Sequence, residues 1–440
     1  MAEFKPEDLA IKALGERTII SPLDQQFQAT GRTHAFYGDD SRVLLDHNLA
    51  NIRGTFERGE EPLCFETAGP RRKIFFRPED TTCAIVTCGG LCPGLNDVIR
   101  SIVMQAYYRY KVPRTLGIPY GFEGLIPDYG HRLINLTPAF VTNIHRFGGT
   151  ALGTSRGPQE TKRMVDQLIE LKVNILFVVG GDGTQRGGKD IGEEALRRGY
   201  RLAVVGVPKT IDNDMAYMDK SFGYETACAA AVDAITAAHT EARSARNGIG
   251  LVKLMGRHSG FIACSAAISS GDANCVLIPE VPFVLEGDHG LVEQLRQRVI
   301  QRGHAVVIVA EGAGQDLVPS SGTDASGNKR LGDIGIFLKK MIEEHFQQCR
   351  TELTLKYIDP SYMIRSVPAS PQDRTYCMRL GQAAVHAGMA GKTALVVARW
   401  HNSYVHLPVG VATLARRTVD PGGDLWLSLL ESTGQLPRYY

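Results

Sequence analysis

A chain of 440 residues exceeds what one ordinary hydrophobic core supports, so at least two domains are expected. Its 43% hydrophobic and 22% charged residues are typical of a globular protein, and a formal net charge of +2 gives no overall attraction to nucleic acid or to a membrane. The chain shows no secretory signal, no membrane-length apolar run and no disulfide framework among its cysteines. These features predict a cytoplasmic protein whose anion binding comes from a local site.

Residues 1–80 are charged and interrupted by Gly and Pro, which predicts an N-terminal extension that packs on the main body. Beyond them, short apolar strands alternate with Gly-rich turns and segments of helical periodicity. The predicted strands of a first lobe are 83–88, 174–179 and 202–207, and those of a second are 248–256, 275–280 and 305–312. This alternation indicates parallel sheets covered on both faces. We therefore expect an α/β fold of two doubly wound, Rossmann-like lobes with a cleft between them.

Turns at the carboxyl ends of these strands are where open α/β sheets bind ligands. The turn 180–184 reads GGDGT, and a helix is expected near Lys189–Arg198. Glycines let the backbone approach a phosphate closely, and a helix N-terminus offers N–H groups to it. Asp182 would repel a polyphosphate unless Mg2+ bridged the two. The turn therefore predicts a metal–nucleotide site.

Other readings of these glycines are weaker. A tight structural turn explains the glycines but not Asp182. A dinucleotide fingerprint beginning at Gly181 has the wrong spacing and the acid in the wrong place. A P-loop ending at Lys189 would have Asp190 where Ser or Thr should bind Mg2+, and a second P-loop fragment at 391–393 lacks its first glycine.

The segment PKTIDND (208–214) places Asp212 and Asp214 after a buried strand. In an extended backbone, both carboxylates would point the same way. One could then accept the proton of an attacking hydroxyl, which suits phosphoryl transfer because its loose transition state demands little of the base. Asx turns that cap the loop are the alternative.

Cations follow the strands of the second lobe. Arg257 lies in the segment MGRHSG, and Lys356 and Arg365 flank Tyr362 further along the chain. Cations from separate segments suit a sugar phosphate, although each alone also fits a solvated surface. Glu311 follows another strand, where it could accept a hydrogen bond from a sugar hydroxyl or cap a helix.

Six segments together resemble phosphofructokinases in order and spacing: GGLCPGLNDVIR, GGTALGTSRG, GGDGT, PKTIDND, MGRHSG and the segment around Glu311. The resemblance spans residue 83 to about 400, and the extension resembles the long-chain ATP-dependent branch, which shares motifs with pyrophosphate-dependent enzymes. It implies transfer of the γ-phosphoryl of Mg-ATP to the 1-hydroxyl of fructose 6-phosphate. It also implies a cytoplasmic, allosteric homo-oligomer, either a dimer or a tetramer.

The resemblance implies a role for each matching position. The nucleotide contacts are Gly90, Arg156, Gly157, Gly181, Asp182, Gly183 and Thr184, and Asp182 is also the Mg2+ ligand. The general base is Asp212, with Asp214 and Arg257 as the other catalytic residues. The sugar-phosphate contacts are Thr210, Ile211, Asp212, Met255, Gly256, Arg257, Glu311, Tyr362 and Arg365, to which the residue pattern adds Lys356.

These roles divide the chain. We expect a nucleotide-binding lobe at 81–222, completed by about 363–413, and a sugar-phosphate-binding lobe at 223–362, completed by about 414–440.

Three positions depart from the short bacterial type of the family. Tyr362 stands where that type has His, and Gly248 stands where it has an Arg that reaches a neighbouring subunit. Arg100 matches the first of two effector-binding arginines, but Met104 stands at the second. The short type's effector site is therefore not expected here.

Two residues bear on the phosphoryl donor. Pyrophosphate users usually carry a second Asp where this chain has Gly183, and a side chain there would fill the α-phosphate space. Lys209 is typical of pyrophosphate users, but the long ATP-dependent branch combines Gly and Lys as this chain does. ATP is the expected donor and pyrophosphate the alternative, since steric exclusion decides more than an added cation.

Three rival functions share parts of the pattern. A catalytically silent sugar-phosphate-sensing subunit should lack Asp182 or Asp212, and both are present. Lipid, diacylglycerol and NAD kinases share GGDGT but lack PKTIDND and MGR at these positions. A nicotinamide oxidoreductase is disfavoured by the acid in the turn.

Overall fold

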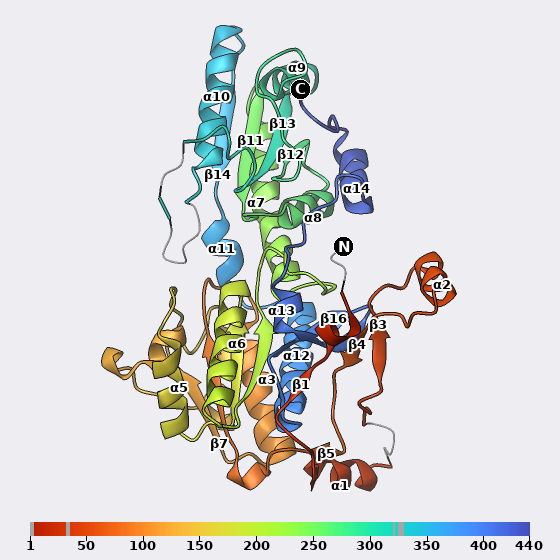
Figure 1. The fold of residues 1–440 in the computed structure, drawn as a ribbon. Coiled ribbons are helices and arrows are strands. Elements are labelled where there is room, and N and C mark those ends of the chain that lie inside the picture. The colour runs from red at the N-terminus through yellow and green to blue at the C-terminus, as the bar shows by residue number, and fades with distance from the viewer. Residues whose placement is uncertain (1–3, 32–35, 320–321, 324–329) are drawn as a thin grey trace. The chain divides into compact units, whose positions relative to one another are not determined.

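A computed structural model describes residues 4–31, 36–319, 322–323 and 330–440 (Figure 1). Parts of the expected extension (1–3, 32–35) and of the expected second lobe (320–321, 324–329) lie outside the described residues. The first of two compact units comprises Met1–Thr210, Met215–Phe222 and Pro368–Ala415. The second comprises Ile211–Asp214, Gly223–Val367 and Arg416–Tyr440. Both units are α/β, as predicted.

The described part of the first unit contains a sheet of nine strands in the order β3-β4-β17-β16-β10-β9-β6-β7-β8. The five central strands, β16, β10, β9, β6 and β7, pair in parallel. The strands at the two edges, β3, β4 and β17 on one side and β8 on the other, pair antiparallel. Their bounds are β3 Arg42–Leu44, β4 Cys64–Thr67, β6 Thr82–Thr87, β7 Arg114–Ile118, β8 Ile134–Asn135, β9 Ile175–Gly180, β10 Ala203–Pro208, β16 Leu395–Trp400 and β17 Ser403–Pro408.

Helices cover both faces of this sheet. The main ones are α3 (Leu95–Met104), α5 (Thr161–Glu170), α6 (Asp182–Arg197) and α12 (Pro371–Met389). The unit also contains the shorter helices α1 (Pro22–Ala29), α2 (Leu49–Glu57), α4 (Pro138–Val141) and α13 (Val409–Ala412). Gly188 of α6 packs on Val178, whereas Gly388 of α12 packs on Ile175 and Phe177. Because successive strand residues point to opposite faces, α6 and α12 lie on opposite sides of β9.

The second unit contains a parallel four-stranded sheet in the order β12-β13-β11-β14. Its strands are β11 Gly248–Leu254, β12 Cys275–Leu277, β13 His304–Ala310 and β14 Thr354–Ile358. Its helices are α7 Tyr224–Ser244, α8 Phe261–Ser270, α9 Leu291–Arg302, α10 Ile334–Gln348, α11 Ser361–Ser366 and α14 Asp424–Thr433. Ile249 and Leu251 join the core beneath α9 and α10, whereas Gly250 packs on Ala238 of α7. Both faces of this sheet are therefore covered.

The prediction that the helix of the GGDGT segment begins near Lys189 is wrong, because α6 begins at Asp182. Glycines weaken a helix on their own, which is why the sequence suggested a longer turn. Here they serve packing: an added Cβ would lie 2.9 Å from the Phe122 ring at Gly187 and 3.2 Å from Val178 at Gly188. Asp182 in the first turn also favours the helix, since a carboxylate is stabilised at the positive end of the helix dipole.

The glycine at 248, where the short bacterial type has Arg, is required by packing. A Cβ at this position would lie 2.0 Å from the backbone oxygen of Ala242, at the end of α7. The nearby Arg246 is instead exposed and ion-pairs with Glu352. No side chain fits at the start of β11 unless α7 moves.

We predict that Gly248→Ala lowers the free energy of unfolding by about 2 kcal/mol, because the added methyl group collides with backbone rather than with a flexible side chain. Thermal unfolding followed by circular dichroism measures the change. Gly410→Ala is the matched control, since a Cβ there meets nothing within 4 Å in α13. Equal melting temperatures for Gly248→Ala and wild type would contradict the packing argument.

Candidate functional site

Lys209 joins three turns at the carboxyl ends of β6, β9 and β10 in the first unit. Its side chain is buried, and its Nζ donates to the carbonyl oxygen of Gly90 at 2.6 Å. Its backbone N–H donates to the carbonyl oxygen of Gly180 at 3.0 Å. A Cβ on Gly181 would lie 3.4 Å from the Lys209 carbonyl oxygen. Lys209 thus holds together the turns that are predicted to bind the nucleotide. The sequence suggests a role for this residue only in the choice between ATP and pyrophosphate.

A buried glutamine, missed by sequence reasoning, anchors the start of α6. The side-chain amide of Gln185 donates to the carbonyl oxygens of Val178, Gly180 and Val207 at 3.2, 2.9 and 3.2 Å. Gln185 is 1% exposed, so its side-chain amide bonds to these carbonyl oxygens instead of to water. A Cβ on Gly206 would lie 2.0 Å from the Gln185 side-chain oxygen, which explains the glycine in β10.

The N-terminus of α6 carries Asp182, Gly183 and Thr184. Gly181 is the N-cap and offers no side-chain hydrogen bond, so the first-turn N–H groups are not capped by it. Thr184 packs over Gly180. Gly183 is exposed, its φ is not positive, and an added Cβ would meet nothing within 4 Å. Neither packing nor backbone conformation therefore requires glycine at 183, whereas an approaching phosphate would.

The loop that carries Arg156 and Gly157 is tied to the turn after β6. Thr154 Oγ1 donates to the Gly89 carbonyl oxygen at 2.7 Å, and the Gly89 N–H donates to the Ser155 carbonyl oxygen at 3.1 Å. Arg156 is exposed, and Gly157 has a φ of 105°, which favours glycine. The structure therefore brings the predicted nucleotide residues of the first unit onto one set of connected turns.

The PKTIDND segment is not extended, so the alternation argument for its two acids does not apply. Residues 211–212 form a turn, and Asn213 has a φ of 58°. Thr210 belongs to the first unit, where its carbonyl oxygen accepts from Ser221 Oγ at 2.5 Å. Ile211 is buried and belongs with Asp212 and Asp214 to the second unit.

Asp212 and Asp214 are held by different partners in the second unit. Asp212 Oδ2 lies 3.5 Å from the backbone N–H of Arg257, and its carbonyl oxygen accepts from Ser259 Oγ at 3.0 Å. Asp214 Oδ2 accepts from Arg416 Nη1 at 2.9 Å. Asp214 therefore forms an ion pair, whereas Asp212 faces a backbone donor.

Burial raises the pKa of Asp212 to about 7, and the neighbouring charges of Asp214 and Glu311 act in the same direction. Burial also raises the pKa of Glu311, with Arg257 and Lys253 opposing the shift. A carboxyl group whose pKa is near neutrality is a much stronger base than an ordinary Asp. The structure thus adds a property that the residue pattern did not predict.

Glu311 and Gly256 are joined at the ends of β13 and β11. The Glu311 N–H donates to the Leu254 carbonyl oxygen at 2.8 Å, and the Gly312 N–H donates to the Gly256 carbonyl oxygen at 3.1 Å. Gly256 has a φ of 132°, and a Cβ there would lie 2.5 Å from the Ser259 carbonyl oxygen. Met255, Gly256 and Arg257 are consequently held beside Glu311 by close backbone contacts.

Tyr362 and Arg365 lie together on α11. The Arg365 guanidinium lies 4.6 Å from the centre of the Tyr362 ring, and Tyr362 itself is 75% exposed. Arg365 Nε is buried and finds no acceptor among the described residues. Lys356 stands apart, because it is exposed on β14 and pairs in register with Gly250, well before the end of β11.

Three supporting residues of the second unit were missed. Ser259 is fully buried against the Asp212 backbone, and Arg416 pairs with Asp214. Lys253 bonds Asp333 at 3.0 Å and Asp359 at 2.8 Å, close to Glu311. The pattern of the MGRHSG segment could have suggested Ser259, but no local signal connects Arg416 to residues two hundred positions earlier.

Comparison with known proteins identifies the family. The family model described as phosphofructokinase matches residues 82–388. An ATP-dependent 6-phosphofructokinase of Amycolatopsis methanolica is 47% identical over 98% of this chain and 95% of its own length. One of Borreliella burgdorferi is 46% identical over 97% of both chains, and one of Trypanosoma cruzi is 50% identical over 98% of this chain and 88% of its own.

Solved structures share the fold at lower identity. A pyrophosphate-dependent phosphofructokinase of Marinobacter aquaeolei superimposes with a TM-score of 0.67 at 20% identity, covering 80% of this chain and 91% of that one. The Pichia pastoris phosphofructokinase gives a TM-score of 0.62 at 23% identity, covering 77% of this chain and 36% of that one. No described helix combines the length and apolar character needed to span a bilayer. With its matched motifs, its fold and its full-length relatives in agreement, the chain belongs to the phosphofructokinase family.

Proposed function

We propose that this chain is an ATP-dependent 6-phosphofructokinase, which transfers the γ-phosphoryl of Mg-ATP to the 1-hydroxyl of fructose 6-phosphate and forms fructose 1,6-bisphosphate. The observation that carries the proposal is Asp212, a half-buried carboxyl group whose pKa is raised to about 7 and whose Oδ2 lies 3.5 Å from the Arg257 backbone N–H. The names of the curated relatives support the reaction and the donor. The protein is accordingly a phosphotransferase of glycolysis.

The nucleotide is assigned to the lobe 81–222 with about 363–413. The turns around Gly90, Gly181 and Gly157 would cradle the phosphates, with Arg156 and the N-terminus of α6 supplying positive charge. Asp182 would hold Mg2+, which when bound neutralises phosphate oxygens. The residues present fit Mg2+, because this ion usually binds one or two protein carboxylates. Asp182 would supply one carboxylate, and phosphate oxygens and water would fill the remaining coordination positions.

The sugar phosphate is assigned to the lobe 223–362 with about 414–440. Arg365 Nε offers a buried donor that no described residue satisfies, which suits a 6-phosphate. Glu311 would accept from a sugar hydroxyl. Arg257 would balance charge near the reacting oxygen. Lys356 is the weakest of the assigned contacts because of its distance along the sheet.

Asp212 would take the proton of the 1-hydroxyl as the bond to phosphorus forms. Its raised pKa makes the transfer favourable, and the ion pair between Asp214 and Arg416 fixes the loop that carries it. The homo-oligomeric state, allosteric control and cytoplasmic location implied by the resemblance belong to this proposal as well.

The experiment that tests the function measures fructose 1,6-bisphosphate formation from fructose 6-phosphate and Mg2+, with ATP and pyrophosphate in parallel. Activity with ATP alone is expected. Activity with pyrophosphate alone would instead mean that Lys209 determines the choice of phosphoryl donor. No activity with either donor would favour a catalytically silent subunit that senses sugar phosphates.

Replacing the proposed base tests its role directly. We predict that Asp212→Asn lowers kcat about a thousandfold, because proton acceptance is lost. The Kd for fructose 6-phosphate, measured by calorimetry, should change little, since the amide keeps the shape of the side chain. Asp219→Asn is a control in the first unit. A variant with near wild-type kcat would remove Asp212 as the base.

The pKa of Asp212 predicts a pH profile. The base must be deprotonated, so kcat/KM should fall about tenfold per pH unit as the pH drops below about 7. Steady-state rates from pH 5.5 to 8.5 measure this limb, and the residual activity of Asp212→Asn should lack it. A wild-type profile that stays flat to pH 5.5 would contradict the raised pKa.

Gly183 provides a test of donor choice. We predict that Gly183→Asp lowers kcat/KM for ATP at least about a hundredfold, because a carboxylate would repel the phosphates it adjoins. Folding should be unaffected, since the new Cβ meets nothing within 4 Å. Gly183→Ala adds bulk but no charge, so its kcat/KM for ATP should lie between that of wild type and that of Gly183→Asp. ATP kinetics close to wild type for the Asp variant would exclude the steric and electrostatic argument.

A further inference from the structure

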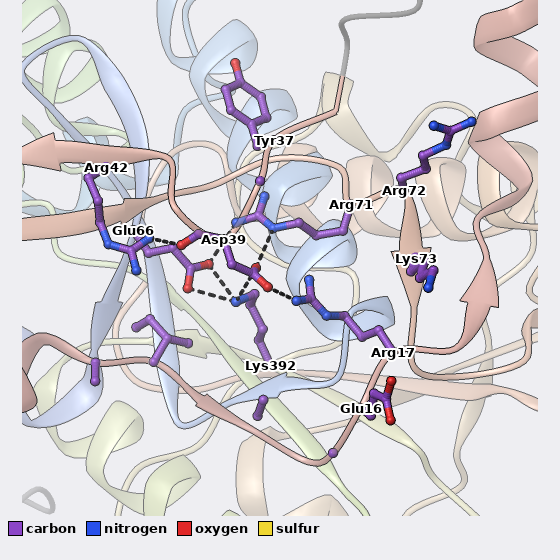
Figure 2. A pocket seen from close by; sticks show the side chains of 15 residues that line it. Glu16, Arg17, Tyr37, Asp39, Arg42, Glu66, Arg71, Arg72, Lys73 and Lys392 are labelled. Atoms are coloured by element: carbon purple, nitrogen blue, oxygen red, sulfur yellow. Dashed lines mark hydrogen bonds and ion pairs between the residues drawn. The ribbon is translucent and has the colours of Figure 1, made fainter.

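A second pocket lies in the first unit, away from the turns assigned to nucleotide. It has a volume of about 580 Å3, and its lining comes from residues 10–17, 37–42 and 66–73 together with Lys392. Figure 2 shows Arg17, Arg71, Lys392, Asp39 and Glu66 meeting at the centre of the pocket, with Tyr37 and Arg72 pointing away from them. All of them lie outside the residues 82–388 that match the family model. The pocket is therefore formed by the N-terminal extension together with Lys392, and it includes none of the residues assigned to catalysis.

Backbone pairing fixes the walls of the pocket. Strand β1 (Lys12–Ala13) pairs with β15 (Lys392–Thr393), which sets Ala13 opposite Lys392. Strands β3 and β4 set Arg42 opposite Glu66, and β2 (Ile19–Ile20) pairs with β5 (Lys73–Ile74). The lining residues are thus held by short sheets rather than by loops alone.

Buried charges form the floor. Arg71 is 2% exposed and donates to Glu66 Oε1 at 2.8 Å and to the carbonyl oxygens of Gly69 and Thr67. Lys392 is 5% exposed and donates to Glu66 Oε2 at 2.8 Å. Burial opposes ionisation of Glu66, but His406 and Lys392 hold its pKa well below the usual range. Glu66 is therefore fully engaged by the floor.

Cations outnumber carboxylates around the space. The lining contains six cations, Arg17, Arg42, Arg71, Arg72, Lys73 and Lys392, against three carboxylates, Glu16, Asp39 and Glu66, and Arg72 also pairs with Asp24 outside the lining. Burial and the nearby Arg71 lower the pKa of Arg17, and burial lowers that of Lys392, with Arg71 and Arg17 acting in the same direction. This crowding of like charge is relieved by any anion that enters.

One anion already stands at the centre. The Asp39 carboxylate, whose side chain is 50% exposed, pairs with Arg17, with Arg71 Nε at 3.3 Å and with Lys392 Nζ at 3.5 Å. Figure 2 shows it between these three cations. Asp39 lies in a loop and is half-exposed, yet its carboxylate pairs with three cations, and two of them, Arg71 and Lys392, are buried. Its position marks where an anion is stabilised.

We propose that this pocket binds a small molecule carrying a phosphate group, and that the Asp39 carboxylate occupies the phosphate position when that molecule is absent. Guanidinium groups converge on phosphate oxygens with charge-assisted hydrogen bonds, and a dianion suits the excess of cations. The volume falls within the range of about 300–1,000 Å3 typical of small-molecule sites, so the space admits more than a phosphate alone. Exposed Lys73 would contact the remainder, whereas Arg72 already pairs with Asp24 Oδ1 at 3.1 Å.

The test is calorimetric titration of the full chain with inorganic phosphate at constant ionic strength, with fructose 6-phosphate and a non-hydrolysable ATP analogue present in excess. The variants are Arg17→Ala and Asp39→Asn, which leave the buried floor intact. Lys12→Ala is the matched control, because Lys12 lies on β1 but does not line the pocket.

We expect saturable binding to wild type and to Lys12→Ala with equal Kd, and at least about tenfold weaker binding to Arg17→Ala, since one lost charge-assisted bond is worth about a factor of ten or more. Asp39→Asn should bind about threefold or more tightly, because the competing carboxylate has lost its charge. No saturable binding to wild type, a Kd for Arg17→Ala equal to that of wild type, or an unchanged Kd in Asp39→Asn would each overturn the proposal. These readouts do not depend on kinase activity.

Discussion

The amide of Gln185 is the contact on which the first unit's binding turns depend. It donates to strand-end carbonyls of both β9 and β10, so the first turn of α6 cannot move without leaving buried acceptors unsatisfied. Each such loss costs about 1–3 kcal/mol. Asp182 and Gly183 are thereby placed on a rigid element, and Lys209 joins the turn after β6 to the same framework.

Two carboxylates of the proposed site differ because their surroundings differ. Asp182 sits at a helix N-terminus, where the dipole favours a charged carboxylate. Asp212 is half-buried near two other acids, Asp214 and Glu311, which favours its protonated form. In the roles proposed above, the same residue type would hold a cation in one unit and accept a proton in the other.

Much of the fold followed from the sequence, because continuous apolar strands and helical periodicity are local signals. The strands β6, β9, β10, β11 and β13 lie within a residue or two of their predicted bounds. The start of α6 did not follow, because its glycines are explained by Phe122 and Val178, which are distant in sequence. Likewise, Arg416, the turn at Asp212 and the cationic pocket arise from tertiary contacts that no single segment encodes. The roles assigned to the site residues stay predictions.

The pairing of β4 with β17 gives the N-terminal segment a protective role. β4 and β3 continue the main sheet beyond β17. A chain that began at residue 81 would present β17 as an exposed edge with unpaired backbone groups, a surface that promotes association between chains. It would also leave Lys392 in place without Glu66 and Asp39. The strands that cover this edge of the main sheet therefore come from a segment that carries none of the assigned catalytic residues.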